Sequence, residues 1–159
     1  MKRVFIDIDH CIGCQACSAA CHYSHSEFRT AVGYGTLRED AMLPFICRQC
    51  EEPACLVACP RDAIKKLDNG IIKRMNMLCI GCGSCALACP FGVIEPDVRS
   101  YIISKCDLCA DRVAEGKEPA CVAACPSGAL TFEEVGEAGE KKVLVGGRME
   151  GHHPIFRRM

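Results

Sequence analysis

Residues 79–90 read Cys79-Ile-Gly-Cys82-Gly-Ser-Cys85-Ala-Leu-Ala-Cys89-Pro90, and this stretch decides the fold. Its spacing, C-x-x-C-x-x-C-x-x-x-C-P, is typical of thiolate ligands to [4Fe–4S] clusters, in which three cysteines bind one cluster and the fourth binds another. Gly81 and Gly83 keep side chains out of the loop, so that backbone N–H groups can approach the cluster sulfurs. Because Pro90 lacks an N–H and disfavours helical geometry at the residue before it, we expect the helix to end there.

The same pattern recurs along the chain. The sixteen cysteines form four quartets with none left over, and each quartet begins C-x-x-C and ends C-x-x-x-C. The quartets are Cys11, Cys14, Cys17 and Cys21; Cys47, Cys50, Cys55 and Cys59; Cys79, Cys82, Cys85 and Cys89; and Cys106, Cys109, Cys121 and Cys125. Four residues separate the middle pair of the second quartet, and residues 110–120 separate that of the fourth. Three quartets close with Cys-Pro, whereas His22 follows the first.

Composition limits the class of protein. A chain of 159 residues can form one compact domain or two very small ones. A net charge of -1 gives no reason to expect nucleic acid or an anionic membrane as a partner. The N-terminus has acids where a signal peptide needs an apolar core, and no apolar run is long enough for a direct membrane span. We therefore expect a reducing, cytoplasmic compartment, where thiols bind metal rather than form disulfides.

Around the quartets the pattern predicts an α+β fold. A strand is expected at 4–8, and a hairpin is expected to join 63–67 to 71–75 through Asp68-Asn69-Gly70. Further strands are expected at 93–95 and 101–104, and a final hairpin is expected to join 129–132 to 142–145. Short helices are expected between the third and fourth cysteines of each quartet, at 18–20, 56–58, 86–88 and 122–124.

Two stretches lack this organisation. Residues 22–46 form a long connection of mixed polar and aromatic residues, and residues 146–159 form a Gly-rich, basic tail. Loops of this length in a small domain are functional or disordered, so either contact with a partner or disorder is the prediction for both.

Sixteen thiolates, at four per cluster, predict four [4Fe–4S] clusters. Zinc is the alternative, because C-x-x-C pairs also form tetrahedral sites. Zinc ribbons, however, need neither a third cysteine two residues later nor a Cys-Pro ending, and the plant-type [2Fe–2S] spacing is absent. With six Phe, three Tyr and no Trp to fill a core, we expect folding to depend on the clusters.

The four quartets, with an insertion in the second and a longer one in the fourth, resemble the four-cluster ferredoxin-type electron-transfer subunits of dimethyl sulfoxide reductase and formate dehydrogenase enzymes. Related subunits serve carbon monoxide dehydrogenases, hydrogenases and aldehyde:ferredoxin oxidoreductases. The resemblance covers roughly residues 4–132. It implies two ferredoxin-like βαββαβ modules, one inserted in the other. The outer module comprises 1–46 and 96–145, the inner module 47–95, and the tail 146–159.

The resemblance also implies a crossed ligation, in which the fourth cysteine of one quartet completes the cluster of its partner quartet. For the two middle quartets the implied ligand sets are Cys47, Cys50, Cys55 and Cys89, and Cys79, Cys82, Cys85 and Cys59. For the outer quartets they are Cys11, Cys14, Cys17 and Cys125, and Cys106, Cys109, Cys121 and Cys21.

The function implied by the resemblance is a relay of single electrons between a catalytic oxidoreductase subunit and a second redox partner or flavin subunit. In the family the cluster of the first quartet lies nearest the catalytic subunit, and the middle pair lies toward the acceptor. The expected partner is a tungsten or molybdenum enzyme, with aldehyde oxidoreductase ranked first and formate dehydrogenase, hydrogenase and carbon monoxide dehydrogenase after it. A free polyferredoxin that shuttles between enzymes is the alternative.

Catalysis by the chain itself is not expected. The quartets use every cysteine, so none is left as a nucleophile, and an open iron site would need an incomplete quartet. The sequence has no P-loop, no dinucleotide-binding fingerprint after a strand and no H-E-x-x-H motif.

Several charged residues lie close to the ligands. Arg48 can raise the potential of its cluster, although a solvated side chain beside Glu51-Glu52 is the favoured interpretation. Lys105 and Asp107 flank Cys106 and leave the same two alternatives open. Surface or capping roles are expected for the five histidines, His10, His22, His25, His152 and His153.

Overall fold

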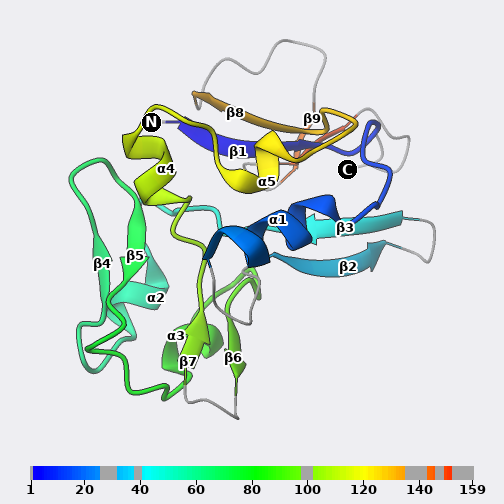
Figure 1. The fold of residues 1–159 in the computed structure, drawn as a ribbon. Coiled ribbons are helices and arrows are strands. Elements are labelled where there is room, and N and C mark those ends of the chain that lie inside the picture. The colour runs from blue at the N-terminus through cyan, green and yellow to red at the C-terminus, as the bar shows by residue number, and fades with distance from the viewer. Residues whose placement is uncertain are drawn as a thin grey trace.

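A computed structural model describes residues 2–25, 32–37, 41–97, 102–134, 143–145 and 149–151, and it has the α+β fold (Figure 1). The strands are β1 (Lys2–Asp7), β2 (Gly33–Leu37), β3 (Ala41–Phe45), β4 (Ile64–Lys66), β5 (Ile72–Arg74), β6 (Glu95–Asp97), β7 (Ile102–Ser104), β8 (Leu130–Glu134), β9 (Val143–Val145) and β10 (Met149–Gly151). The helices are α1 (Ala16–His25), α2 (Ala54–Val57), α3 (Ser84–Leu87), α4 (Ala110–Ala114) and α5 (Ala120–Ala123). Among these described helices, none is long and apolar enough to cross a bilayer.

One four-stranded sheet organises the upper half of the molecule in Figure 1, with strand order β8-β1-β10-β9. β1 pairs antiparallel with β8, where Val4 lies opposite Phe132, and parallel with β10, where Ile6 lies opposite Met149. Val4, Phe5 and Ile6 are all buried, so both faces of β1 are covered. The strand predicted at 4–8 is thus confirmed, and α1 and α5 lie beneath the sheet.

The predicted final hairpin of 129–132 with 142–145 is wrong. β8 pairs with β1 instead, and β9 pairs with β10. The reason is burial: Leu130 and Phe132 of β8 pack in the same core as Val4 and Ile6 of β1, so the edge of β1 is the better partner. The other edge of β1 pairs with β10. The sequence pattern assigns the residues of β10 to the C-terminal tail.

Two hairpins lie where the sequence predicts strands. β4 and β5 pair antiparallel, and Gly70 takes the left-handed conformation (φ 79°) in the turn that joins them. β6 and β7 also pair, although β6 begins two residues later than expected and contains Pro96. Proline is compatible with this position because a two-stranded ribbon has free edges that need no N–H donor.

The region 22–46 is more regular than expected. α1 continues to His25, because His22 stands where the other quartets have the proline that ends the helix. β2 and β3 then form an antiparallel hairpin, with Gly33 opposite Phe45. Disorder is therefore wrong for the described part of this region, whereas contact with a partner stays a prediction.

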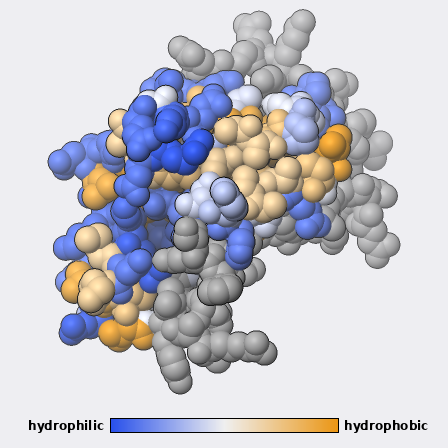
Figure 2. Space-filling view, in the orientation of Figure 1, coloured by the Kyte–Doolittle hydropathy of each residue, from blue (hydrophilic) through white to orange (hydrophobic). Residues whose placement is uncertain are grey.

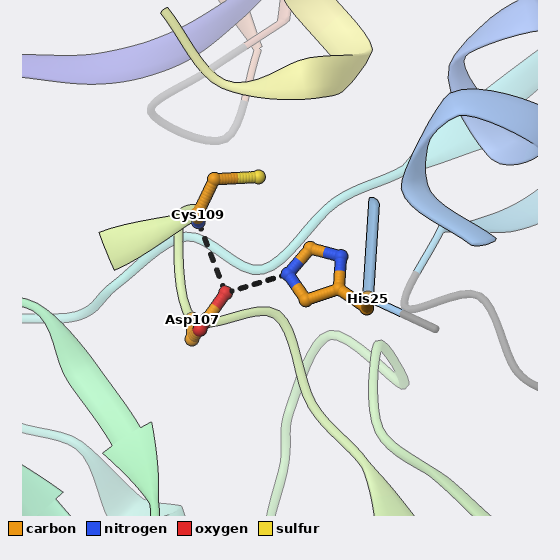
Figure 3. Close-up of side chains that lie close together, drawn as sticks. All are labelled: His25, Asp107 and Cys109. Atoms are coloured by element: carbon orange, nitrogen blue, oxygen red, sulfur yellow. Dashed lines mark hydrogen bonds and ion pairs between the residues drawn. The ribbon is translucent and has the colours of Figure 1, made fainter. Parts of the chain in front are cut away.

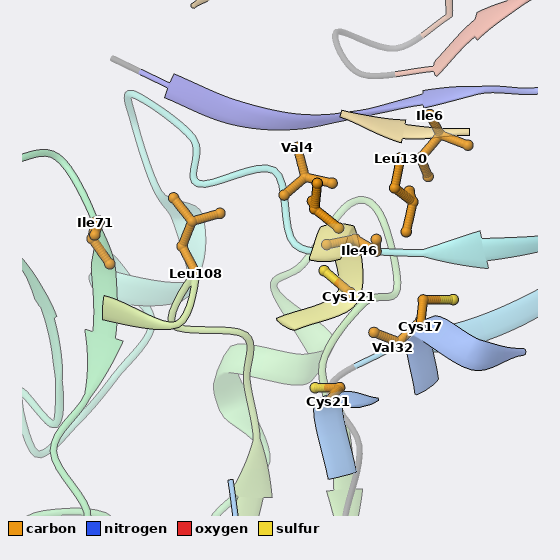
Figure 4. Close-up of a cluster of buried hydrophobic side chains, with 11 residues drawn as sticks. Val4, Ile6, Cys17, Cys21, Val32, Ile46, Ile71, Leu108, Cys121 and Leu130 are labelled. Atoms are coloured by element: carbon orange, nitrogen blue, oxygen red, sulfur yellow. The ribbon is translucent and has the colours of Figure 1, made fainter. Parts of the chain in front are cut away.

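Cysteines and aliphatic side chains together form the core, which has two clusters of buried residues. The first lies under the sheet, where Cys17, Cys21 and Cys121 pack with aliphatic residues that include Val4 and Leu108 (Figure 4). The second lies in the lower half of Figure 1 and comprises Cys47, Ile64, Ile72, Cys85, Val93 and Ile94. Cys106 borders both clusters.

The sheet and the first core cluster should depend on Leu130. Replacing this buried leucine with alanine removes its methyl groups and leaves a cavity, so the free energy of unfolding should fall by about 2–5 kcal/mol. Denaturant unfolding of the metal-loaded protein measures this. Glu133→Ala, at an exposed position of the same strand, should change the value by less than about 0.5 kcal/mol. Equal effects of the two substitutions would contradict the assignment of Leu130 to the core.

Candidate iron–sulfur centres

All four quartets share a backbone conformation between their first two cysteines. The residue immediately before the second cysteine of each C-x-x-C is left-handed, with φ of 66° at Gly13, 50° at Gln49, 68° at Gly81 and 59° at Leu108. Left-handed residues in such loops turn successive N–H groups toward one side and form a concavity that attracts anions, as at many iron–sulfur sites. Only two of the four positions are glycine, so the sequence alone indicates this feature at half of them.

The three Cys-Pro endings also share a structure. The residue three positions after the cysteine donates its N–H to the carbonyl of that cysteine at 3.3 Å, and its φ is positive in each case. These residues are Asp62 after Cys59, Gly92 after Cys89 and Gly128 after Cys125. The predicted end of the helix is confirmed, because α2, α3 and α5 all stop before the Cys-Pro pair. Each turn then leads into a buried segment, beginning at Ala63, Val93 or Ala129.

The cysteines of the first and fourth quartets line two cavities. One cavity lies between the first binding loop and the last Cys-Pro turn, and its cysteines are Cys11, Cys14, Cys17 and Cys125. The other lies beneath β1, and its cysteines are Cys21, Cys106, Cys109 and Cys121. In both cavities three thiols come from one quartet and the fourth comes from the other. The packing of α1 against α5 brings this about.

The middle quartets are brought together in the same way, by the packing of α2 against α3. Burial raises the pKa of Cys55, and the negative charges that raise it further belong to Cys47, Cys89 and Cys50. Cys89, the last cysteine of the third quartet, therefore lies among the thiols of the second.

Cys85 shows the reciprocal arrangement. Burial raises its pKa to about 11, and the neighbouring thiolates that contribute are Cys55, Cys79 and Cys59. Cys59, the last cysteine of the second quartet, therefore lies close to the third.

These thiols are costly to ionise when only protein surrounds them. Burial raises the pKa of Cys121 to about 12, with Cys109, Cys21 and Cys17 adding to the effect. Burial and the nearby Cys47 likewise hold the pKa of Cys106 far above its usual range. Thiolates that lie this close together need positive charge to offset their repulsion. Iron in a cluster supplies that charge. Among the described residues, which include all sixteen cysteines, no disulfide forms.

Hydrogen-bond donors point at several of the sulfurs. The N–H of Ala63 donates to Cys59 Sγ at 3.3 Å, and that of Leu108 donates to Cys106 Sγ at 3.4 Å. The hydroxyl of Ser84 lies 3.4 Å from Cys82 Sγ, and its hydrogen bond lowers the pKa of that thiol. Donors of this kind stabilise thiolate and tune cluster potentials, so the residues present fit an iron–sulfur cluster.

Arg48 is not a solvated side chain beside Glu51-Glu52, and that interpretation is wrong. Its guanidinium stacks on Phe91, 3.7 Å from the ring centroid. Burial lowers its pKa, while the charges of Cys50 and Cys89 act in the opposite direction. The positive charge of Arg48 therefore lies close to the thiols of Cys50 and Cys89.

His25 joins the first quartet to the fourth (Figure 3). Its Nδ1 lies 2.9 Å from the carbonyl oxygen of Cys21, and its Nε2 lies 3.1 Å from Asp107 Oδ1. Asp107 also accepts the N–H of Cys109 at 3.0 Å. The hydrogen bond to Asp107 raises the pKa of His25 far above its usual value, so the ring donates from both nitrogens. The capping role expected for His25 is confirmed, because it binds a carbonyl in the last turn of α1.

Two further histidines lie at the surface. His10 bonds Asp7 at the surface, 2.8 Å away, and His22 is exposed, so a surface role is confirmed for both. His152 and His153 lie outside the described residues.

The left-handed conformation of the residue that ends each Cys-Pro turn can be tested at Gly92. A Cβ at Gly92 would meet no atom within 4 Å, so Gly92→Ala changes only the backbone preference at φ 59°. We expect it to lower the free energy of unfolding by about 1–2 kcal/mol. Gly92→Asn should restore much of this loss, since asparagine tolerates the left-handed region. Denaturant unfolding of the loaded protein is the measurement, and equal stability of all three proteins would refute the proposed turn.

Comparison with known proteins places the chain in a family. Residues 39–135 match the 4Fe-4S dicluster domain, and residues 8–24 match a 4Fe-4S binding domain. The B subunit of anaerobic dimethyl sulfoxide reductase from Escherichia coli (strain K12) is 37% identical over 154 residues, which cover 86% of this chain and 75% of that protein. The nitrate-inducible formate dehydrogenase iron-sulfur subunit of the same organism is 35% identical over 168 residues, covering 87% of this chain and 57% of the relative.

A second formate dehydrogenase relative, the formate dehydrogenase-O iron-sulfur subunit of Escherichia coli (strain K12), is 35% identical and covers 80% of this chain. The chain spans little more than half the length of these two formate dehydrogenase subunits, 57% and 51%. The match to the dimethyl sulfoxide reductase B subunit is more complete, and it agrees with the cysteine cavities and the two domain matches. The chain therefore belongs to the family of ferredoxin-type 4Fe-4S proteins that includes the dimethyl sulfoxide reductase B subunit and the formate dehydrogenase iron-sulfur subunits.

Proposed function

We propose that this chain is the non-catalytic electron-transfer subunit of an oxidoreductase complex and relays single electrons through four [4Fe–4S] clusters. The observation that carries the proposal is the convergence of thiols from paired quartets on shared sites. When bound, such clusters supply one-electron chemistry. The residues of the chain bind the clusters, exclude water from them and set their potentials through hydrogen bonds and nearby charges.

The proposed ligands are all sixteen cysteines in crossed sets. The outer clusters would take Cys11, Cys14, Cys17 and Cys125, and Cys106, Cys109, Cys121 and Cys21, which are the cysteines that line the two cavities. The middle clusters would take Cys47, Cys50, Cys55 and Cys89, and Cys79, Cys82, Cys85 and Cys59. The mutual effects of these thiols on the pKa values of Cys55 and Cys85 support the middle sets.

We also propose that the fold consists of two nested ferredoxin-like modules. Residues 1–46 and 96–145 would form the outer module around the first core cluster, and residues 47–95 the inner module around the second. Apart from Ile71, an inner-module residue that packs in the first cluster, the buried residues of the two clusters follow this division and support it. Of the remaining residues, 146–159, the strand β10 extends the sheet of the outer module.

The two ends of the relay would be the first and third quartets, whose Cys14 and Cys82 are the exposed cysteines. Around Cys82 lie several large exposed apolar side chains of residues 75–87, of which Met77 is 97% exposed and Leu87 is 91% exposed. Near Cys14, Ile12 is 69% exposed. Exposed apolar groups of this kind favour contact with another protein. Figure 2 shows a further hydrophobic band on the face over α1 and α5.

The partner at the first-quartet end would be the catalytic subunit, and the middle pair of clusters would lead to the acceptor or flavin subunit. We propose a tungsten or molybdenum enzyme as the catalytic subunit, with an aldehyde oxidoreductase or a formate dehydrogenase as the candidates and a hydrogenase or a carbon monoxide dehydrogenase after them. The relatives named as formate dehydrogenase and dimethyl sulfoxide reductase subunits support this class. A reducing, cytoplasmic compartment would keep the thiols available for iron.

The assembly is tested by anaerobic purification of the chain from its native cells with a tag. We expect it to elute with a larger catalytic subunit in constant ratio, because exposed apolar surface at both ends of the relay requires cover. Size-exclusion chromatography with subunit identification is the measurement. Elution of the fully loaded chain alone would instead support a free polyferredoxin.

The crossed ligation is tested by single ligand variants of the tagged chain. Cys125→Ser should remove or alter one outer cluster and leave both middle clusters intact, although Cys125 belongs to the fourth quartet. Electron paramagnetic resonance of the reduced protein, with iron and sulfide analysis, is the measurement. Cys89→Ser is the matched variant and should alter a middle cluster only. Loss of a middle cluster from Cys125→Ser would contradict the crossed sets.

A further inference from the structure

A buried lysine lies where the two core clusters meet. Lys105 is 9% exposed, and its ammonium donates to the carbonyl of Ile72 at 2.6 Å and to that of Cys106 at 3.0 Å. It also lies 3.6 Å from the sulfur of Cys47. Ile72 and Cys47 belong to the second core cluster, whereas Cys106 borders both, so a single ammonium connects the two halves of the molecule.

Gln49 binds the same two backbone segments as Lys105, at Ile72 and Cys106. Its side chain is fully buried, its Nε2 donates to the same Cys106 carbonyl at 3.0 Å, and its Oε1 accepts the N–H of Ile72 at 2.7 Å. Gln49 is also the left-handed residue of the second C-x-x-C. The backbone groups of Ile72 and Cys106 are therefore fixed by two side chains, which leaves the ammonium of Lys105 little freedom to move.

The acceptors around this ammonium carry no formal charge in the protein alone. They are two carbonyl oxygens and one thiol sulfur. Burying an ammonium is unfavourable unless an opposite charge lies close enough to compensate it. Once Cys47 and Cys106 bind clusters as thiolates, each cluster with its four thiolates is net negative, and the compensating charge is present on both sides of Lys105.

We propose that Lys105, positioned by Gln49, raises the reduction potentials of two neighbouring clusters together: the one held by Cys47, Cys50, Cys55 and Cys89, and the one held by Cys106, Cys109, Cys121 and Cys21. The inference rests on the proposed function and names the point at which electrons cross from the outer module to the inner one. Lys105 acts through its charge and hydrogen bonds, so it is a positioning residue.

The physical reason is electrostatic. Reduction adds one negative charge to a cluster, and a fixed positive charge nearby stabilises the reduced form more than the oxidised form. Because the charge is shared, both potentials rise together, and the difference between them changes less than either potential does.

The test is a redox titration of the full chain, loaded with iron and sulfide anaerobically and followed by electron paramagnetic resonance. In Lys105→Met, which keeps the length of the side chain without its charge, two of the four midpoint potentials should become more negative and the other two should stay unchanged. Lys105→Arg keeps the charge and should stay close to the wild type. Lys65→Met, at an exposed lysine of β4, is the control and should shift no potential.

The two shifted signals are assigned with Cys50→Ser and Cys109→Ser. Each substitution removes a ligand of one of the two clusters and so alters the signal of that cluster. Unchanged potentials in fully loaded Lys105→Met would overturn the proposal, as would shifts in the other two clusters. Lys105→Gln, which keeps a hydrogen-bond donor, serves if the methionine variant fails to load. Loss of iron from both neutral variants would also overturn the proposal, since Lys105 would then serve assembly alone.

Failure of the inference is distinguishable from failure of the proposed function. The wild-type chain is analysed first, and fewer than four clusters, or zinc in their place, would refute the function before any variant is compared. Four clusters in the wild type with no response to the charge at residue 105 would refute only the role of Lys105.

Discussion

Thiolates that meet in one small cavity repel each other, and we expect the whole structure to depend on cations that offset this repulsion. The cysteines occupy core positions that aliphatic or aromatic side chains fill in most small domains, as Cys17, Cys21 and Cys121 do beneath the sheet. Without metal, burial makes these groups hard to ionise, which the raised pKa values of Cys85 and Cys121 express. We therefore expect metal binding and folding to be coupled in this chain, because the four-residue helices between the cysteines are too short to be stable on their own.

The repeated local structure explains how cysteines of two quartets come together at each proposed site. A left-handed residue shapes each binding loop, and a helix carries the third cysteine and leads to the last one. In three quartets, a turn after Cys-Pro then leads the chain into a buried segment. Packing α1 against α5 and α2 against α3 then exchanges the last cysteines between quartets. The junction at Lys105 and Gln49 joins the two pairs, so the same contacts that hold the molecule together also define the order of the proposed relay.

Local sequence predicts the features that local physics determines. The turn at Asp68-Asn69-Gly70 and the helix ends before Cys-Pro depend on a few adjacent residues, and both predictions are confirmed. Strand partners depend instead on distant edges, so the sequence pattern indicates neither the pairing of β8 with β1 nor the strand β10. The missing proline at His22 is visible in the sequence, but its consequence, a longer α1 that brings His25 to Asp107, is not. The burial of Lys105 has no signal in the sequence, because it arises where two segments 33 residues apart meet.

The central claim is that these thiolates hold four [4Fe–4S] clusters, and metal analysis tests it most directly. The chain should be prepared anaerobically and fully loaded, and its iron, acid-labile sulfide and zinc measured against protein concentration. The account predicts iron and sulfide in equal amounts, sufficient for four clusters per chain, with no stoichiometric zinc. Zinc in place of iron, or iron for only one or two clusters, would contradict it.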